Sequence, residues 1–326
     1  MANITICKSH TEDEQAMRDV YCDTLMELAK ANKNILILDA DLMAAVGVAR
    51  FAQQYPDQAI NCGIQEANMF GVAAGLSAVG KIPFAHTFGT FATRRAADQV
   101  FLSCAFAGFN VKVVGSDPGV TASINGGTHM PLEDMGIMRM IPTMTIIEPT
   151  DAAMLADIVR QAANTYGMFY IRLSRKKMVQ IFEPGSTFDI GRGIVLREGS
   201  DLTIIAAGIC VADALTAADE LASAGISCRV VNIFTIKPID AGLITACARE
   251  TGAVVTAENH NIIGGLGSAV AEVLGEHAPV PMERIGVCDE FGEVGSVEYL
   301  KERFGMTAKD IANKCRKVLQ RKRNEK

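Results

Sequence analysis

The chain has 326 residues, of which 49% are hydrophobic and 21% charged, so it is a folded globular protein long enough for two domains. Its net charge of −6 argues against a surface for nucleic acid or anionic membranes, and no apolar run reaches the length of a membrane span. Nine scattered cysteines without a Cys-x-x-Cys pair, and no signal peptide, disfavour a zinc or disulfide framework and lead us to expect a cytoplasmic protein.

The first part of the chain alternates helical stretches with short apolar strands. Its pattern predicts helices over residues 17–31, 70–80 and 151–163, and strands over residues 34–39, 111–115, 145–148 and 169–173. Thr150 or Asp151 is the natural cap of the third helix. Such alternation is typical of an α/β domain with a mainly parallel sheet.

A second α/β unit follows a break in this pattern. Residues 182–189 contain Pro-Gly turn chemistry and show no periodicity, which indicates a linker. Beyond it, the sequence predicts strands over residues 202–208, 228–233 and 254–258, and helices over residues 211–224 and 267–274. We therefore expect one domain over residues 1–185 and a smaller one over residues 186–326.

Glu66 is a carboxylate between apolar segments, in the run Asn-Cys-Gly-Ile-Gln-Glu-Ala-Asn-Met of residues 61–69. A buried charge is costly unless another group pairs with it. By itself, Glu66 is therefore either a surface residue at a helix start or a carboxylate retained for chemistry. The residues around it leave both interpretations open.

Three other positions could contact a ligand. Phe88 and Phe91 lie three residues apart among polar neighbours, as an aromatic pair of the core or as rings for a flat ligand. His129 lies in a glycine-rich loop before a helix that we expect to start at Pro131; such a loop is either an ordinary surface loop or a substrate contact.

Charged residues also stand near the ends of predicted strands. Arg172 and Arg175 follow the strand at residues 169–173, where parallel sheets bind ligands, and each could bind a phosphate or form a structural ion pair. Asp117, before Pro118 and Gly119, is expected to begin a turn.

Taken in order, these segments resemble the C-terminal half of transketolase. The likeness covers nearly all of residues 15–320 and is greatest to split transketolases, in which two polypeptides share the work. Similar segments occur in deoxyxylulose-phosphate synthases and in β subunits of 2-oxoacid dehydrogenases. The matching segments are residues 35–42, 63–69, 87–91, 127–134, 171–175 and 234–240, and Glu258-Asn-His260 before residues 264–267.

The resemblance implies a pyrimidine-binding domain over residues 1–185, the family's C-terminal domain after it, and thiamine diphosphate as cofactor. Glu66 matches the catalytic glutamate that hydrogen-bonds the aminopyrimidine ring of the cofactor. Phe91 matches the ring stacked on the pyrimidine, with Phe88 close by, and Asp41 matches an aspartate near the cofactor. In such enzymes the cofactor supplies the carbanion chemistry and the protein orients it.

Some of the substrate contacts that the resemblance implies are present in this chain, and others are replaced. Arg18, His129 and Arg175 match the family's contacts to sugar and sugar phosphate, and we count His129 among the catalytic residues. Ser116 replaces a histidine that binds the substrate phosphate, and Asn125 replaces an aspartate that faces the sugar hydroxyls.

A serine that touches the phosphate is also replaced, by Ala45. Loss of a cation weakens anion binding, and an amide can donate as well as accept hydrogen bonds. We therefore expect a ketose with a modified terminus or branch, such as a sulfo-sugar or a branched sugar phosphate.

The family's Gly-Asp-Gly…Asn motif, which holds Mg²⁺ and the diphosphate, is absent from this sequence. We therefore assign no metal ligand to this chain and expect a smaller N-terminal partner subunit to supply that domain, in an α2β2 assembly. The main prediction is a subunit that transfers a two-carbon ketol unit from a ketose to an aldose.

Two alternatives stay open. One is another thiamine enzyme, either a 2-oxoacid dehydrogenase-like β subunit or a deoxyxylulose-phosphate synthase-like enzyme. The other is a non-catalytic binding or regulatory module on the same fold.

Overall fold

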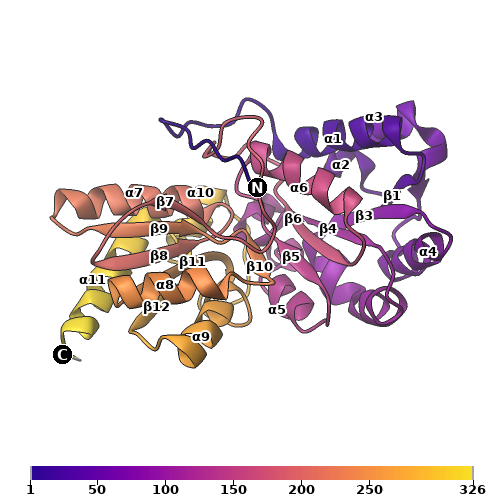
Figure 1. Ribbon diagram of the computed structural model, residues 1–326. Helices are drawn as coiled ribbons and strands as arrows, with labels where there is room; N and C mark the ends of the chain where they lie inside the picture. Colours follow the sequence, from indigo (N-terminus) through magenta and orange to yellow (C-terminus); the bar gives the residue numbers. More distant parts are fainter. Residues whose placement is uncertain (1, 325–326) are drawn as a thin grey trace.

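Two sheets, each largely parallel, organise residues 2–324, the part of the chain that the computed structural model describes (Figure 1). The larger sheet has seven strands in the order β10-β5-β6-β4-β3-β1-β2, and all neighbours are parallel except β10 and β5. Its strands are β1 (Ile35–Asp39), β2 (Ala59–Asn61), β3 (Ile82–Phe88), β4 (Lys112–Ser116), β5 (Thr145–Ile147), β6 (Phe169–Leu173) and β10 (Thr235–Lys237).

Helices cover this sheet, which is why β1, β4 and β6 are buried along their whole length and are mostly apolar. Between the strands lie α1 (Met17–Ala31), α2 (Met43–Val46), α3 (Ala49–Gln54), α4 (Glu66–Ala78), α5 (Asp134–Arg139) and α6 (Ala152–Asn164). Wide π-type turns form η2 (Phe91–Arg95) and η3 (Gln99–Phe106), and tight helical turns form η1 (Pro56–Gln58), η4 (Gly119–Asn125) and η5 (Gly127–His129).

The smaller sheet has five strands in the order β12-β11-β8-β9-β7, with only β7 antiparallel to its neighbour. The strands are β7 (Ile194–Arg197), β8 (Leu202–Ala206), β9 (Cys228–Asn232), β11 (Val254–Asn261) and β12 (Met282–Val287). The helices are α7 (Cys210–Ser223), α8 (Ala241–Thr251), α9 (Leu266–His277), α10 (Val297–Arg303) and α11 (Ala308–Asn324). The expected fold class, two α/β domains with a mainly parallel first sheet, is confirmed.

Local signals place most elements well. The side chain of Asp151 accepts a hydrogen bond from the Met154 amide and caps α6, as the sequence indicates. The helix expected to start at Pro131 is wrong, because α5 begins three residues later at Asp134. Tertiary contacts set that start, since the Asp134 carboxylate is bound by Arg172 and Tyr170 of β6.

The two domains share structural elements. Strand β10 follows β9 of the smaller sheet, yet it pairs with β5 and extends the larger sheet. The N-terminal segment also pairs with the expected linker, since the Cys7 and Glu183 amides donate to Ile181 and Thr5 carbonyls. The boundary at residue 185 stays a prediction, and the chain crosses between the sheets more than once.

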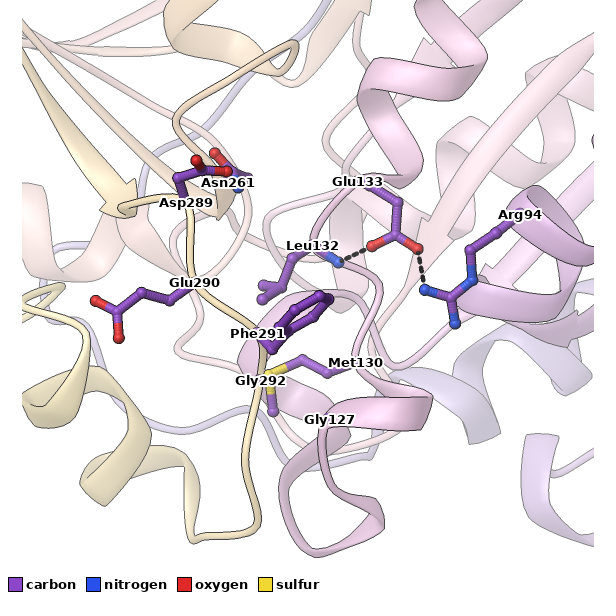
Figure 2. Close-up of a pocket in the computed structure, with 10 residues that line it drawn as sticks. All are labelled: Arg94, Gly127, Met130, Leu132, Glu133, Asn261, Asp289, Glu290, Phe291 and Gly292. Atoms are coloured by element: carbon purple, nitrogen blue, oxygen red, sulfur yellow. Dashed lines mark hydrogen bonds and ion pairs between the residues drawn. The ribbon is translucent and has the colours of Figure 1, made fainter.

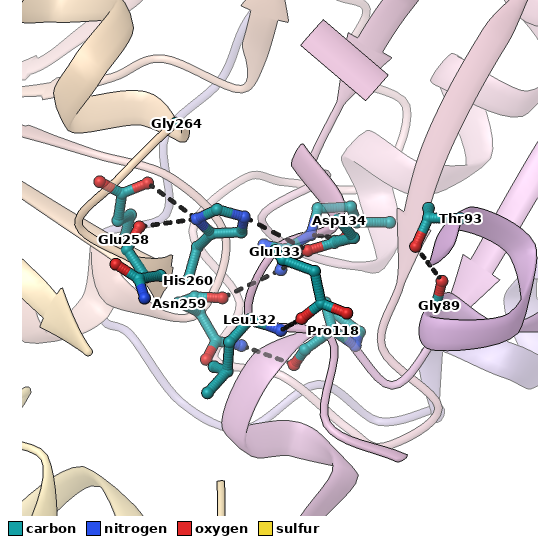
Figure 3. A network of polar contacts seen from close by, with 12 residues as sticks. Gly89, Thr93, Pro118, Leu132, Glu133, Asp134, Glu258, Asn259, His260 and Gly264 are labelled. Carbon is teal, nitrogen blue, oxygen red and sulfur yellow. Dashed lines mark hydrogen bonds and ion pairs between the residues drawn. The ribbon is translucent and has the colours of Figure 1, made fainter. Parts of the chain in front are cut away.

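A wholly buried guanidinium lies where the domains meet (Figure 3 shows neighbouring residues). Arg172 donates to both oxygens of Asp134, at 2.8 and 3.0 Å, and to the Asn259 carbonyl of β11 at 3.0 Å. Its other terminal nitrogen is 2.8 Å from Glu148. Arg172 is therefore a structural ion pair rather than a ligand contact.

Among the helices described within residues 2–324, none combines the length and hydrophobicity that a membrane span requires.

We expect Asp134→Asn to lower the free energy of unfolding by about 3 kcal/mol, because it leaves one side of the buried Arg172 charge without its partner. The control is Glu27→Gln, which removes the exposed pair with Arg160 and should cost below about 1 kcal/mol. Urea unfolding of the isolated chain measures both. Equal losses for the two variants would contradict a structural role for the buried pair.

Candidate active site

The carboxyl ends of the parallel strands meet along one edge of the larger sheet, and the predicted site residues collect there. Asp41 follows β1, Glu66 follows β2, and Phe88 ends β3. Ser116 ends β4, and Arg175 comes two residues after β6. Ligands bind at this edge in open α/β sheets because the connecting loops all converge there.

Glu66 is the first residue of α4 and is only 2% exposed. One terminal nitrogen of Arg95 donates to both of its carboxylate oxygens at 2.9 Å. The same guanidinium lies over Phe91, with its carbon 3.8 Å from the ring centre. Arg95 itself is about half exposed, so the ion pair is open to solvent on one side.

Phe88, Phe91 and His129 form an aromatic cluster. Their ring centres are 5.2–6.1 Å apart, and all three pairs meet edge to face. Phe88 ends β3 while Phe91 starts η2, so a strand-to-helix turn, not one helix face, brings the two rings together. The Nδ1 atom of His129 is 2.9 Å from the Thr128 hydroxyl.

Two arginines converge on one backbone carbonyl. Arg18 and Arg175 donate to the Ala45 carbonyl at 3.3 and 3.4 Å. The guanidinium of Arg175 lies 5.1 Å from the Phe88 ring centre and pairs with the buried Asp117 carboxylate at 2.5 Å. Burial raises the pKa of Asp117 above its usual value, and Arg175 acts against that rise.

Ser116 and Asn125 supply polar atoms that no described protein group satisfies. Within residues 2–324, the buried Ser116 hydroxyl and Asn125 amide nitrogen have no hydrogen-bond partner. Buried polar groups are normally paired, so these two atoms stand out as candidates for contact with a bound group.

Asp41 is exposed and adopts a left-handed backbone conformation with a φ of 65°. Asn61 holds it in place, because the Asn61 side chain accepts from the Asp41 amide and donates to its carboxylate, both at 3.2 Å. Close to this turn, wholly buried Asp39 and His86 lie 3.0 Å apart. This buried pair supports the loop that carries Asp41.

The second domain contributes a buried polar group behind the site (Figure 3). Asn259 accepts from the Val120 amide at 2.8 Å and donates to the Pro118 carbonyl at 2.7 Å, so it fixes the loop after β4. Glu258 accepts from the first amides of α9. Burial raises the pKa of Glu258 to about 7 and lowers the pKa of the neighbouring His260 to about 4.

A cavity of about 460 Å³ lies beside the His129 loop, between the two domains (Figure 2). Residues 127–133 form one wall, and the loop of residues 289–292 forms the other. Arg94 reaches in and pairs with Glu133 at 3.0 Å. Its acidic lining, with Glu133, Asp289 and Glu290, differs from the arginine-lined edge near Phe88.

Family models match both halves of the chain. The model described as "Transketolase, pyrimidine binding domain" matches residues 13–180, more than half of the chain, and "Transketolase, C-terminal domain" matches residues 191–311. The chain belongs to the transketolase family. Membership in this thiamine-dependent family implies thiamine diphosphate as the cofactor, as expected from the sequence.

Curated relatives of similar length support a split organisation. This transketolase chain is 56% identical to "6-deoxy-6-sulfo-D-fructose transketolase subunit SqwH" of Clostridium sp. strain MSTE9, over 95% of this chain and 96% of the relative. It is 41% identical to "Putative transketolase C-terminal section" of Methanocaldococcus jannaschii, over 92% and 95%. It is also 35% identical to one subunit of the apulose-4-phosphate transketolase of Phocaeicola vulgatus, over 94% and 97%.

Comparison with solved structures gives the same family. A structure titled "Split gene transketolase, inactive beta4 tetramer" has a TM-score of 0.87 and 46% identity, covering 94% of this chain and 98% of that one. Transketolase from Leishmania mexicana shares the fold at a TM-score of 0.79, with 22% identity over 98% of this chain and 47% of that one. The predicted resemblance to a split transketolase subunit is confirmed.

Sequence reasoning misses three residues of this site. Arg95 stands out in the sequence only as part of the run after Phe91, Asp117 is expected only to begin a turn, and Asn61 carries no motif of its own. The pairing of Arg95 with Glu66 joins residues 29 positions apart, so no local spacing indicates it. For Asp117, the Pro-Gly that follows predicts a turn, and nothing in the local sequence indicates its ion pair with Arg175.

Proposed function

We propose that this chain is the C-terminal subunit of a heteromeric transketolase, which transfers a two-carbon ketol unit from a ketose to an aldose with thiamine diphosphate. The observation that carries the proposal is the arrangement of Glu66 and Phe91. A buried carboxylate and an aromatic ring face the same space, and a flat hydrogen-bond donor fits between them. The curated relatives described above are all named as transketolases or their sections.

The Arg95 guanidinium supports the fit of an aminopyrimidine ring. It is planar, it stacks on Phe91 at 3.8 Å, and it donates to Glu66, which are the contacts an aminopyrimidine would need. In the proposed site, Glu66 would hydrogen-bond that ring through its carboxylate, and Phe91 with Phe88 would orient it. Asp41 lies at the same sheet edge and would contact the cofactor from the loop after β1.

The substrate would lie between the aromatic cluster and the two arginines. We propose that His129 contacts the reacting sugar and that Arg18 and Arg175 bind its anionic end. The free polar atoms of Ser116 and Asn125 would complete this surface. Because Asp117 already neutralises part of the Arg175 charge, the pocket suits a singly charged anion better than a doubly charged one.

We propose that Mg²⁺ and the diphosphate are held by an N-terminal partner subunit, and that two copies of each chain form an α2β2 assembly. Arg95 and Phe91 are both partly exposed to solvent. A second chain could therefore enclose a cofactor against these two side chains, which supports this arrangement. All nine cysteines of the chain are unpaired, which fits a cytoplasmic location.

The test of this function is Glu66→Gln in the complex with the partner subunit. We expect kcat to fall by about a hundredfold or more, because a proton-exchanging group is lost, while the complex still forms. Glu272→Gln is the matched control, since it also removes a carboxylate paired with an arginine, Arg139. Full turnover with Glu66→Gln would rule out the catalytic role and leave a binding module.

Arg95 competes for the space of the proposed cofactor ring and must move aside for it. Arg95→Ala should therefore lower the dissociation constant for thiamine diphosphate and Mg²⁺ by about tenfold. In that variant the cofactor no longer has to displace a side chain that is held by its ion pair with Glu66. Calorimetric titration of the two-subunit complex measures this without reference to turnover.

The adjacent Arg94→Ala is the control for that experiment, since Arg94 pairs with Glu133 instead of Glu66. Weaker cofactor binding by Arg95→Ala, or the same change for both variants, would show that Arg95 is not a competitor.

We propose a sulfo-sugar as the donor ketose, supported by the 56% identity to a sulfofructose transketolase subunit and by Ser116 at the anion-binding edge. The value of kcat/KM should be at least about tenfold higher for 6-deoxy-6-sulfo-D-fructose than for xylulose 5-phosphate. Ser116→His should reduce the ratio of these two kcat/KM values, because the histidine can carry a positive charge that favours the doubly charged phosphate. High efficiency of the wild-type complex with xylulose 5-phosphate would overturn the assignment.

A further inference from the structure

A buried pair of titratable side chains lies beside the turn that carries Asp41, and the proposed chemistry does not use it. Asp39 is the last residue of β1, and His86 lies opposite it where β1 pairs with β3. Both side chains are wholly buried, and the Nε2 atom of His86 is 3.0 Å from the Oδ2 atom of Asp39. The Asp39 carboxylate depends on such a partner, because an unpaired charge in the interior is very costly.

The two carboxylate oxygens of Asp39 contact different parts of the chain. Oδ1 accepts a hydrogen bond from the Leu42 amide, three residues later, while Oδ2 faces His86. Aspartate side chains commonly stabilise turns in this way, by accepting from a backbone amide a few residues further along. The carboxylate therefore links strand β3 to the turn of residues 39–42.

Asp41 lies inside this turn, in a left-handed conformation with a φ of 65°. A residue other than glycine keeps such a conformation only where its surroundings over-determine it. Asn61 of β2 supplies one constraint through its two hydrogen bonds to Asp41, but both residues are exposed to water. The contacts of Asp39 supply a second constraint from the buried side, where electrostatic interactions are stronger.

His86 is suited to hold the Asp39 carboxylate in one orientation. An ionised carboxylate can only accept hydrogen bonds, so the imidazole nitrogen that faces it carries a proton. The Tyr21 ring packs edge to face on the imidazole, with ring centres 6.0 Å apart. Within residues 2–324, the Nδ1 atom of His86 has no hydrogen-bond partner, so no group in that part of the chain competes with Asp39 for it.

We propose that His86 is a positioning residue: through Asp39, it holds the turn of residues 39–42 in the conformation that presents Asp41 at the sheet edge. The inference rests on the proposed function only for the cofactor that Asp41 would contact. His86 itself is wholly buried, so it acts through the turn and not by touching cofactor or sugar. Its loss should therefore change the affinity for the cofactor and leave turnover of the loaded enzyme nearly intact.

His86→Leu leaves the Asp39 carboxylate buried without its partner and should loosen the turn. In the isolated chain, hydrogen–deuterium exchange at the Leu42 amide should become at least about tenfold faster. His86→Gln is the matched variant and should keep the wild-type exchange rate, because its side-chain amide can still donate to Asp39. Thr203→Val is the control, since it removes a buried polar contact of the smaller sheet, 2.8 Å from the Thr251 hydroxyl, and should leave exchange at Leu42 unchanged.

The cofactor provides the second measurement. In the complex with the partner subunit, His86→Leu should raise the dissociation constant for thiamine diphosphate and Mg²⁺ by about tenfold in a calorimetric titration. With saturating cofactor, its kcat should stay within about twofold of the wild type. His86→Gln should bind the cofactor as the wild type does.

Unchanged exchange at Leu42 in folded His86→Leu would overturn the proposal. Equal effects of His86→Leu and His86→Gln would also overturn it, since packing and not the polar contact would then hold the turn. Faster exchange with an unchanged dissociation constant would do the same, because the turn would not serve the cofactor.

If His86→Leu fails to fold, as judged by circular dichroism, Asp39→Ala decides. It removes the acceptor of the Leu42 amide, so it should give the same faster exchange and weaker cofactor binding. A wild-type complex that binds no thiamine diphosphate would refute the proposed function. The exchange experiment needs neither cofactor nor sugar, so it would still decide whether His86 holds the turn.

Discussion

The buried charge of Arg172 is the constraint on which the arrangement of the site depends. An unpaired guanidinium in the interior is very costly, so Asp134, Glu148 and the Asn259 carbonyl must all be in place around it. These groups come from α5, the end of β5 and β11, and thus from both domains. Burial alone would lower the pKa of Arg172, but its carboxylate partners hold that pKa above the usual value.

The residues of this buried ion pair are close in sequence to residues of the candidate site. Arg172 lies on β6, three residues before Arg175, and Asp134 starts the helix that follows the His129 loop. Asn259 ties the loop after β4 to the second domain through both ends of its side-chain amide. The C-terminal domain therefore acts on the site by holding two of its loops, although its own residues lie behind the sheet edge.

Local backbone strain occurs at the same edge of the sheet. Asp41 and Asp117 both adopt left-handed conformations, with φ values of 65° and 57°, and each is held by a specific partner, Asn61 or Arg175. Such strain persists only where the surroundings over-determine it, and it commonly occurs where a protein positions functional groups.

The sequence by itself determined most of the elements and the family and indicated the candidate site residues, because short apolar strands, the Asp151 cap and the segments around Glu66 and His129 are local signals. The start of α5 was misplaced because it depends on contacts with β6. Only the tertiary structure decided which charged residues face the site: Arg172 and Arg175 look alike in sequence, yet one is buried between two carboxylates and the other lies over Phe88. Sequence patterns report the faces of single helices and strands, whereas ion pairs such as Arg95 with Glu66 are set by which loops the fold brings together at the sheet edge.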